Sequence, residues 1–158
     1  MKDSKERTRA QMDDTVEDQR KTISELQTPV IQVWEGILAL PIVGTVDTAR
    51  AQKMTEALLD RITATGASVV LLDITAVPTV DTAFAKHLIE TIAAARLLGT
   101  EVMVVGLTTN TALTLVHLAV DLGGVVTRTT MAKGLELAFD RLGLAVVRRA
   151  PAVEITHP

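Results

Sequence analysis

Two kinds of apolar pattern alternate along most of the chain. Short runs of Val, Ile and Leu predict buried strands, whereas apolar residues that recur every three or four positions predict amphipathic helices. The predicted strands are Val30–Trp34, Ile37–Val43, Ser68–Leu72, Val102–Val105 and Val125–Thr127. Glu35 and Gly36 separate the first two runs and indicate a hairpin. Pro41, inside the second run, indicates an edge strand or a bulge.

Four helices are predicted between and after these strands. Asp47 or Thr48 is expected to cap the first helix, which ends at Gly66. Its apolar stripe consists of Ala51, Met54, Leu58 and Ile62. The other helices are predicted at Asp81–Leu98, from about Asn110 to Leu122, and from Thr129 or Thr130 to Gly143. This alternation predicts an α/β fold with a mainly parallel sheet, which the opening hairpin makes mixed.

The two ends of the chain differ in composition from its centre. Residues 1–28 are rich in charges of both signs, and their few apolar residues follow a heptad-like spacing. These apolar residues are Met12, Val16, Ile23 and Leu26. We interpret 1–28 either as a charged helical linker or as a solvated arm. A linker helix would pair with a copy of itself or continue a coiled coil from a preceding domain, and we expect any helix to end before Pro29. A folded domain is predicted at 29–143 and a loosely ordered tail at 144–158.

Composition excludes several kinds of protein. Only 2% of the residues are aromatic and the net charge is −3, so no base-stacking platform or basic nucleic-acid surface is expected. The chain has no cysteine, which removes disulfides, thiolate zinc sites and thiol catalysis. No apolar stretch approaches the roughly 20 residues that span a bilayer, and no signal-peptide pattern is visible. We therefore expect a cytoplasmic protein without membrane or nucleic-acid partners.

Asp73 follows a predicted buried strand, a position where α/β proteins often carry reactive groups. Receiver-like phosphoacceptor domains place an aspartate there, but they also need an acidic pair after the first strand to hold Mg²⁺. No such pair follows either opening strand. The other interpretation, which we favour, is that Asp73 accepts hydrogen bonds from backbone amides of the 75–82 turn. No metal site is expected.

Sequence motifs of nucleotide binding and hydrolysis are missing as well. The chain has no Walker or G-x-G-x-x-G pattern, no G-x-S-x-G elbow and no H-E-x-x-H pair. No catalytic residue and no cofactor are therefore predicted. Asp81 and Thr82 stand at the start of a predicted helix, where Asp81 is expected to act as the cap. Thr82 is either an ordinary first-turn residue or a hydroxyl presented for phosphorylation.

Three longer stretches carry a family likeness: TPVIQVWEGILALPIVGTVDTARA, LLDITAVPTVDTAFAKHLIETIAAARLLGTEVMVVG and ALTLVHLAVDLGGVVTRTTMAKGLELA. Together they resemble a STAS domain, and most closely the stressosome R subunit (RsbR type), a relative of the anti-anti-sigma factors. The resemblance runs from about residue 28 to residue 142. It implies a STAS fold, which is a mixed β-sheet with an opening hairpin and about four helices packed mainly on one side.

The same resemblance implies a function in bacterial general stress signalling. Such proteins are non-enzymatic scaffolds that co-assemble with a paralogous S-type STAS protein into a large stressosome. The assembly sequesters a serine/threonine kinase of the GHKL type, phosphorylation releases the kinase, and a phosphatase resets the complex. Two alternatives stay open: a stand-alone anti-anti-sigma factor that binds an anti-sigma kinase, and a receiver-like phosphoacceptor domain.

The resemblance also implies two phosphorylated threonines, Thr82 and Thr114. Thr82 follows the aspartate of the V-D-T motif, and Thr114 lies in Ala112–Val116, which matches a second family segment. Anti-anti-sigma factors carry serine at the first position, so Thr82 favours the R type. The chain departs from the family at 108–110, where Thr-Thr-Asn replaces Arg-Pro-Glu. R-type proteins usually also carry a sensory N-terminal domain, of which residues 1–28 match only the linker.

Overall fold

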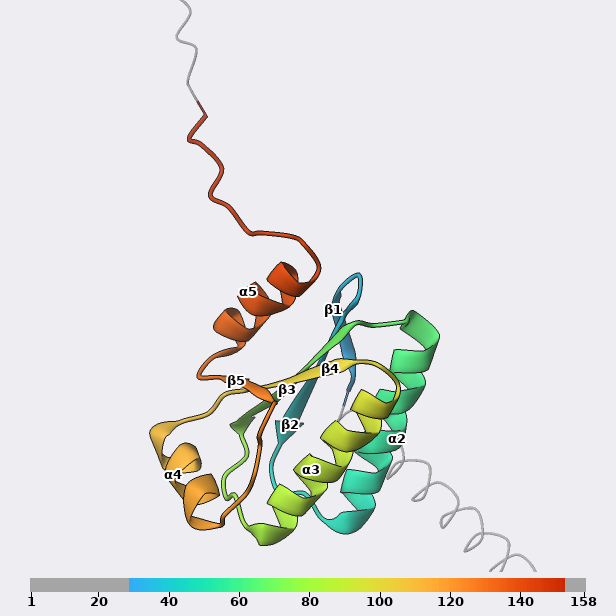
Figure 1. Cartoon of the computed structure of the whole chain (residues 1–158), viewed down its shortest axis with the longest axis vertical. Helices are drawn as coiled ribbons and strands as arrows, with labels where there is room; N and C mark the ends of the chain where they lie inside the picture. The colour runs from blue at the N-terminus through green and yellow to red at the C-terminus, as the bar shows by residue number, and fades with distance from the viewer. Residues whose placement is uncertain (1–28, 153–158) are drawn as a thin grey trace, which may run out of the picture.

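The computed structural model describes residues 29–152, and the element labels follow Figure 1. The strands in this range are β1 (Ile31–Trp34), β2 (Ile37–Val43), β3 (Val69–Ala76), β4 (Glu101–Val105) and β5 (Val126–Arg128). The helices are α2 (Thr48–Thr65), α3 (Thr82–Leu97), α4 (Thr109–His117) and α5 (Met131–Arg141). Residues 144–152 contain no helix or strand. The predicted linker at 1–28, and residues 153–158 of the predicted tail, lie outside the described residues.

The strands form one mixed sheet in the order β1-β2-β3-β4-β5, which confirms the predicted fold class. β1 and β2 are antiparallel, and the other three neighbouring pairs are parallel. Each parallel step moves the chain in the same direction across the sheet, so right-handed crossovers place the connecting helices on one face. α2 and α3 lie side by side on that face, and α5, which follows the last strand, covers the other (Figure 1).

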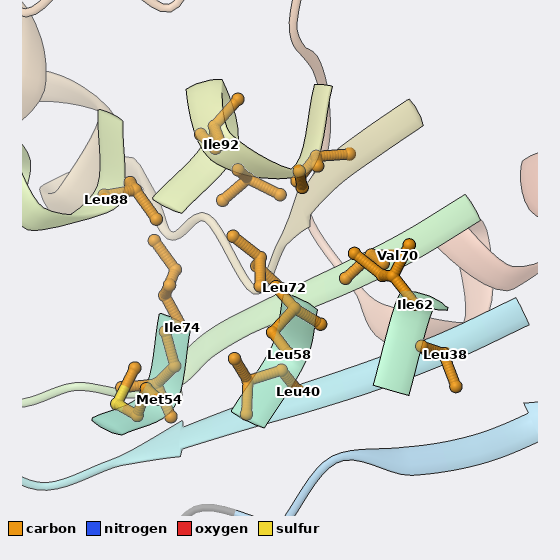
Figure 2. Close-up of a cluster of buried hydrophobic side chains, with 14 of the residues drawn as sticks. Leu38, Leu40, Met54, Leu58, Ile62, Val70, Leu72, Ile74, Leu88 and Ile92 are labelled. Carbon is orange, nitrogen blue, oxygen red and sulfur yellow. The ribbon is translucent and has the colours of Figure 1, made fainter. Parts of the chain in front are cut away.

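Two hydrophobic clusters, one on each face, hold the sheet between its helices. The larger cluster joins β2, β3 and β4 to α2 and α3, and Figure 2 shows Met54, Leu58 and Leu88 directed at the strands from the two helices. The smaller cluster joins alternate residues of the same strands to α5. At Gly134 a Cβ atom would lie 2.3 Å from Cγ1 of Val105, so the glycine allows α5 to approach the sheet closely.

Local capping signals predict the limits of α2 correctly. The Asp47 carboxylate accepts a hydrogen bond from the Arg50 amide at 2.7 Å, which satisfies a first-turn donor. Gly66 ends the helix in the left-handed conformation, with φ +65°. The four predicted stripe residues are the buried residues of the helix. The predicted bulge near Pro41 is also confirmed, because the β2–β3 register shifts between Pro41 and Val43.

Two predicted boundaries are wrong. β3 does not end at Leu72 but continues to Ala76, because its extra residues find backbone partners in β2 and β4, including Pro41 and Val105 opposite Asp73. α4 does not reach Leu122 but ends at His117, because Ala119 takes a left-handed conformation with φ 54°. No helix within 29–152 is long and apolar enough to cross a membrane.

Candidate functional site

The carboxyl ends of the parallel strands form the edge where the candidate residues gather. Each of β2, β3, β4 and β5 ends there and is followed by a helix, so four helix N-termini point toward this edge. The caps are Asp47, Asp81, Thr108 and Thr130, and each accepts a bond from a first-turn amide. The unpaired amides and dipoles of helix N-termini favour negative charge. This edge is therefore electrostatically suited to an added phosphate.

Asp81 and Thr82 form the start of α3. Asp81 has an extended backbone, and its Oδ1 accepts a hydrogen bond from the Phe84 amide at 2.8 Å. Phe84 and Ala85 are buried in the first turn, which anchors this end of the helix to the core. Thr82 is exposed, and its hydroxyl makes no hydrogen bond with any described residue. The hydroxyl is thus accessible on a firmly held helix end.

Asp73 lies inside β3 and supports the backbone beside the same edge. Its Oδ1 accepts hydrogen bonds from the Thr75 amide at 2.9 Å and from the Thr75 hydroxyl at 2.5 Å. Gly106 packs against this pair, since a Cβ atom there would lie 2.2 Å from the Thr75 hydroxyl oxygen. Of the predicted 75–82 turn, Thr75 alone donates hydrogen bonds to Asp73 among the described residues. Among residues 29–152 no group of three potential metal ligands occurs.

Thr114 lies in the middle of α4, in a different environment. Its side chain is half-buried, and its hydroxyl donates a hydrogen bond to the carbonyl of Asn110 at 2.9 Å. α4 buries only one residue, Leu115, and its N-terminus is capped by the neutral hydroxyl of Thr108. Thr82 and Thr114 therefore belong to separate helices and share no hydrogen-bond partner in the described residues.

An apolar groove beside Thr114 was not predicted from the sequence. It is open, has a volume of about 650 Å³, and lies between α4 and β5. Leu113 and Val116 on its α4 side are 53% and 75% exposed. Of the described residues that line the groove, only Arg128 at the end of β5 carries a positive charge. The signal in the sequence was the presence of two large apolar residues, Leu113 and Val116, close to Thr114 in a short predicted helix.

Comparisons with known proteins agree with this architecture. The family model described as "STAS domain" matches residues 28–128. The RsbT co-antagonist protein RsbRA of Bacillus subtilis is 40% identical over 133 residues, which are 84% of this chain and 48% of that protein. The chain thus spans about half the length of this curated relative.

Two solved structures extend the comparison. An RsbS variant from Moorella thermoacetica superimposes with a TM-score of 0.65 and 28% identity, covering 75% of this chain and 99% of that one. The second is a chain from a structure described as the molecular architecture of the stressosome, a signal integration and transduction hub. It superimposes with a TM-score of 0.60 and 27% identity, covering 72% of this chain and 98% of that one. With the family match over more than half of its residues, the chain belongs to the STAS domain family.

Proposed function

We propose that this chain is a non-enzymatic scaffold of bacterial general stress signalling that works in the cytoplasm. In this proposal it co-assembles with a paralogous S-type STAS protein and holds a serine/threonine kinase of the GHKL type. RsbT, the partner in the relative's name, is the first protein to test in that role. The observation that carries the proposal is the exposed hydroxyl of Thr82 at the capped start of α3, which makes no hydrogen bond with any described residue.

Thr82 is the first proposed switch residue. A phosphate would add about −1.5 to −2 charges beside Asp81. The first-turn amides and the helix dipole favour this charge, whereas the neighbouring carboxylate opposes it. Because Phe84 and Ala85 hold the helix end in the core, the added charge changes the surface rather than the fold. A docked kinase would meet this altered surface directly.

Thr114 is the second proposed switch residue, and it acts by another route. Phosphorylation there removes the hydroxyl bond to Asn110 and places a dianion beside the apolar groove. A dianion in the middle of a helix gains nothing from the N-terminal dipole. The phosphate therefore disturbs α4 and the groove together. A phosphatase that removes both phosphates would restore the kinase-binding state.

The test is phosphosite mapping on the full chain, assembled with an S-type paralogue and incubated with the kinase and ATP. Mass spectrometry is expected to find phosphate on Thr82 and Thr114, and Thr82→Ala and Thr114→Ala each to remove one site. Thr79→Ala is the matched control, because Thr79 is an exposed threonine in the loop before α3. Phosphate absent from both proposed residues, or present on Thr79 alone, would sink the site assignment.

Kinase release is measured on the same samples by pull-down. Double phosphorylation is expected to weaken kinase retention at least tenfold, which corresponds to about 1.4 kcal/mol. The Thr82→Ala, Thr114→Ala double variant should retain the kinase in the presence of ATP. Light scattering separates this proposal from a stand-alone anti-anti-sigma factor. A mass below about 50 kDa with the paralogue, against a chain mass of 16.9 kDa, would contradict a large assembly.

A further inference from the structure

The exposed side of α3 carries a lysine close to the first proposed switch residue. Residues of this helix that face solvent recur every three or four positions, and they include Thr82, Lys86 and Glu90. Thr82 and Lys86 are four residues apart, so their side chains are neighbours on the helix surface, with Cβ atoms about 6 Å from each other. Phe84 and Ala85 between them are buried, which holds this part of the helix in place. The ammonium group of Lys86, on its flexible four-carbon stem, can therefore reach a phosphate carried by Thr82.

The order of the two residues along the helix also favours a contact. An acidic group four residues before a lysine stabilises a helix more than the reverse order does, because it agrees with the helix dipole. A phosphate on Thr82 would be such a group, placed before Lys86. Glu90 stands four residues after Lys86 and so has the less favourable order. Once it is phosphorylated, residue 82 is therefore the better partner of the two.

Lys86 is available for such a contact. Its side chain is exposed, and its ammonium group takes part in no ion pair or hydrogen bond within residues 29–152. Oε2 of Glu90 lies 4.0 Å from Nδ1 of His87 instead. A phosphate on Thr82 would thus gain a cation without breaking an ion pair of the described residues.

Two arginines of the same pair of helices are engaged elsewhere. Arg96, near the end of α3, donates a hydrogen bond to the carbonyl of Gly124 at 3.1 Å. At about 1.5 Å per residue, it lies roughly 21 Å along the helix from Thr82. On the neighbouring α2, Arg50 donates a hydrogen bond to the carbonyl of Thr45 at 2.7 Å. The helix spacing therefore singles out the lysine at position 86 as the cation beside residue 82.

We propose that Lys86 is a positioning residue of the switch, whose ammonium group forms an ion pair with a phosphate on Thr82. The pair offsets the repulsion from Asp81 and keeps the phosphate doubly charged near neutral pH, because the second pKa of a phosphorylated side chain is only about 6. It also holds the phosphate against the helix, so that a docked partner meets a charge in a fixed place. The inference rests on the proposed function and deepens it by naming the residue that sets the charge and orientation of the phosphate.

The test uses the full chain with phosphothreonine installed at position 82 during translation, so it needs no kinase. A pH titration followed by phosphorus NMR gives the second pKa of this phosphate at low ionic strength. Lys86→Gln removes the positive charge and is expected to raise this pKa by about half a unit, because a neighbouring cation favours the dianion. Lys86→Arg keeps the charge and should restore the value of the unaltered chain. Salt at roughly 1 M should remove most of the difference, because it screens exposed charge pairs.

A matched control makes the result specific. Lys133→Gln removes the same charge from an exposed position in the first turn of α5, on the other face of the sheet, and should leave the pKa of the phosphate unchanged. A pKa that Lys86→Gln does not raise, that Lys86→Arg does not restore, or that Lys133→Gln raises equally overturns the inference. Because the phosphate is installed without a kinase, this result does not depend on phosphosite mapping. A missing ion pair leaves Thr82 standing as a mapped site, and a missing site leaves the ion pair measurable, so the two failures are distinguishable.

Discussion

The two helices that carry the candidate threonines differ in how firmly they are attached. α3 has 16 residues, six of them buried, and a carboxylate cap on its first turn. α4 has nine residues and buries only Leu115, and it ends at His117, two residues before Ala119 with its positive φ. The stability of a protein helix comes mainly from the apolar face that it buries. α3 is therefore part of the rigid domain, whereas α4 belongs to its least stable part.

We propose that this difference gives the two threonines separate physical roles as switch residues. Thr82 sits on a fixed helix end, so a change there alters the charge that a partner meets. Thr114 bonds within a weakly held helix, so a change there alters the position or order of the helix and its groove. In this proposal a phosphate on Thr82 changes the charge of the surface, whereas a phosphate on Thr114 changes the conformation of α4.

The sharpest test of the comparison removes one core leucine from each helix. Leu88→Ala is expected to lower the free energy of unfolding by about 2–5 kcal/mol, because Leu88 lies in the main cluster. Leu115→Ala should open α4 locally and move the global unfolding midpoint much less. Urea unfolding measures the first effect and hydrogen exchange the second. Equal shifts of the global midpoint would contradict the assignment of α4 to a separate, weaker unit.

A second test compares the two caps. Asp81→Ala should cost about 1 kcal/mol of global stability, because the Phe84 amide loses its acceptor. Asp81→Asn keeps an acceptor at the same place and should cost much less. Thr108→Ala removes the equivalent bond to Thr111, yet its effect should appear only in the hydrogen exchange of α4. If Thr108→Ala lowered global stability as much as Asp81→Ala does, α3 and α4 would not differ in how firmly they are attached.

The smallest effect is expected at the end of α4. Ala119→Gly should stabilise this helix by up to about 1 kcal/mol, because glycine adopts positive φ without steric cost. The backbone amides of α4 should then exchange their hydrogens with solvent about fivefold more slowly. Ala112→Gly is the matched control, since the same substitution in the body of α4 should destabilise it by a similar amount. Slower exchange in both variants would show that backbone conformation at Ala119 is not the cause.

Features with a local physical cause could be predicted from the sequence. The limits of α2 follow from Asp47 and Gly66, whose capping chemistry acts within a few residues. The end of α4 could not be predicted in this way, because Ala119 adopts a conformation that its residue type does not signal. The extension of β3 past Asp73 depends on partners in β2 and β4 that are distant in the chain.

In the candidate site, too, some features have a local cause and others depend on tertiary packing. Asp81 as a helix cap is a local property and follows from its position before a periodic segment. The exposure of the Thr82 hydroxyl and the hydrogen bond of the Thr114 hydroxyl depend on what each helix packs against. The groove beside Thr114 and the exposure of Trp34 likewise required the folded chain.

By itself, the sequence determined the order of strands and helices, the buried stripe of α2 and the family likeness, because periodicity and capping act over short distances. Tertiary structure alone decided that α5 covers the opposite face of the sheet and leaves the side chains of β1 partly exposed. The physical reason is that crossover handedness constrains only the helices that connect parallel strands. A helix after the last strand is placed by packing, here by the close approach at Gly134.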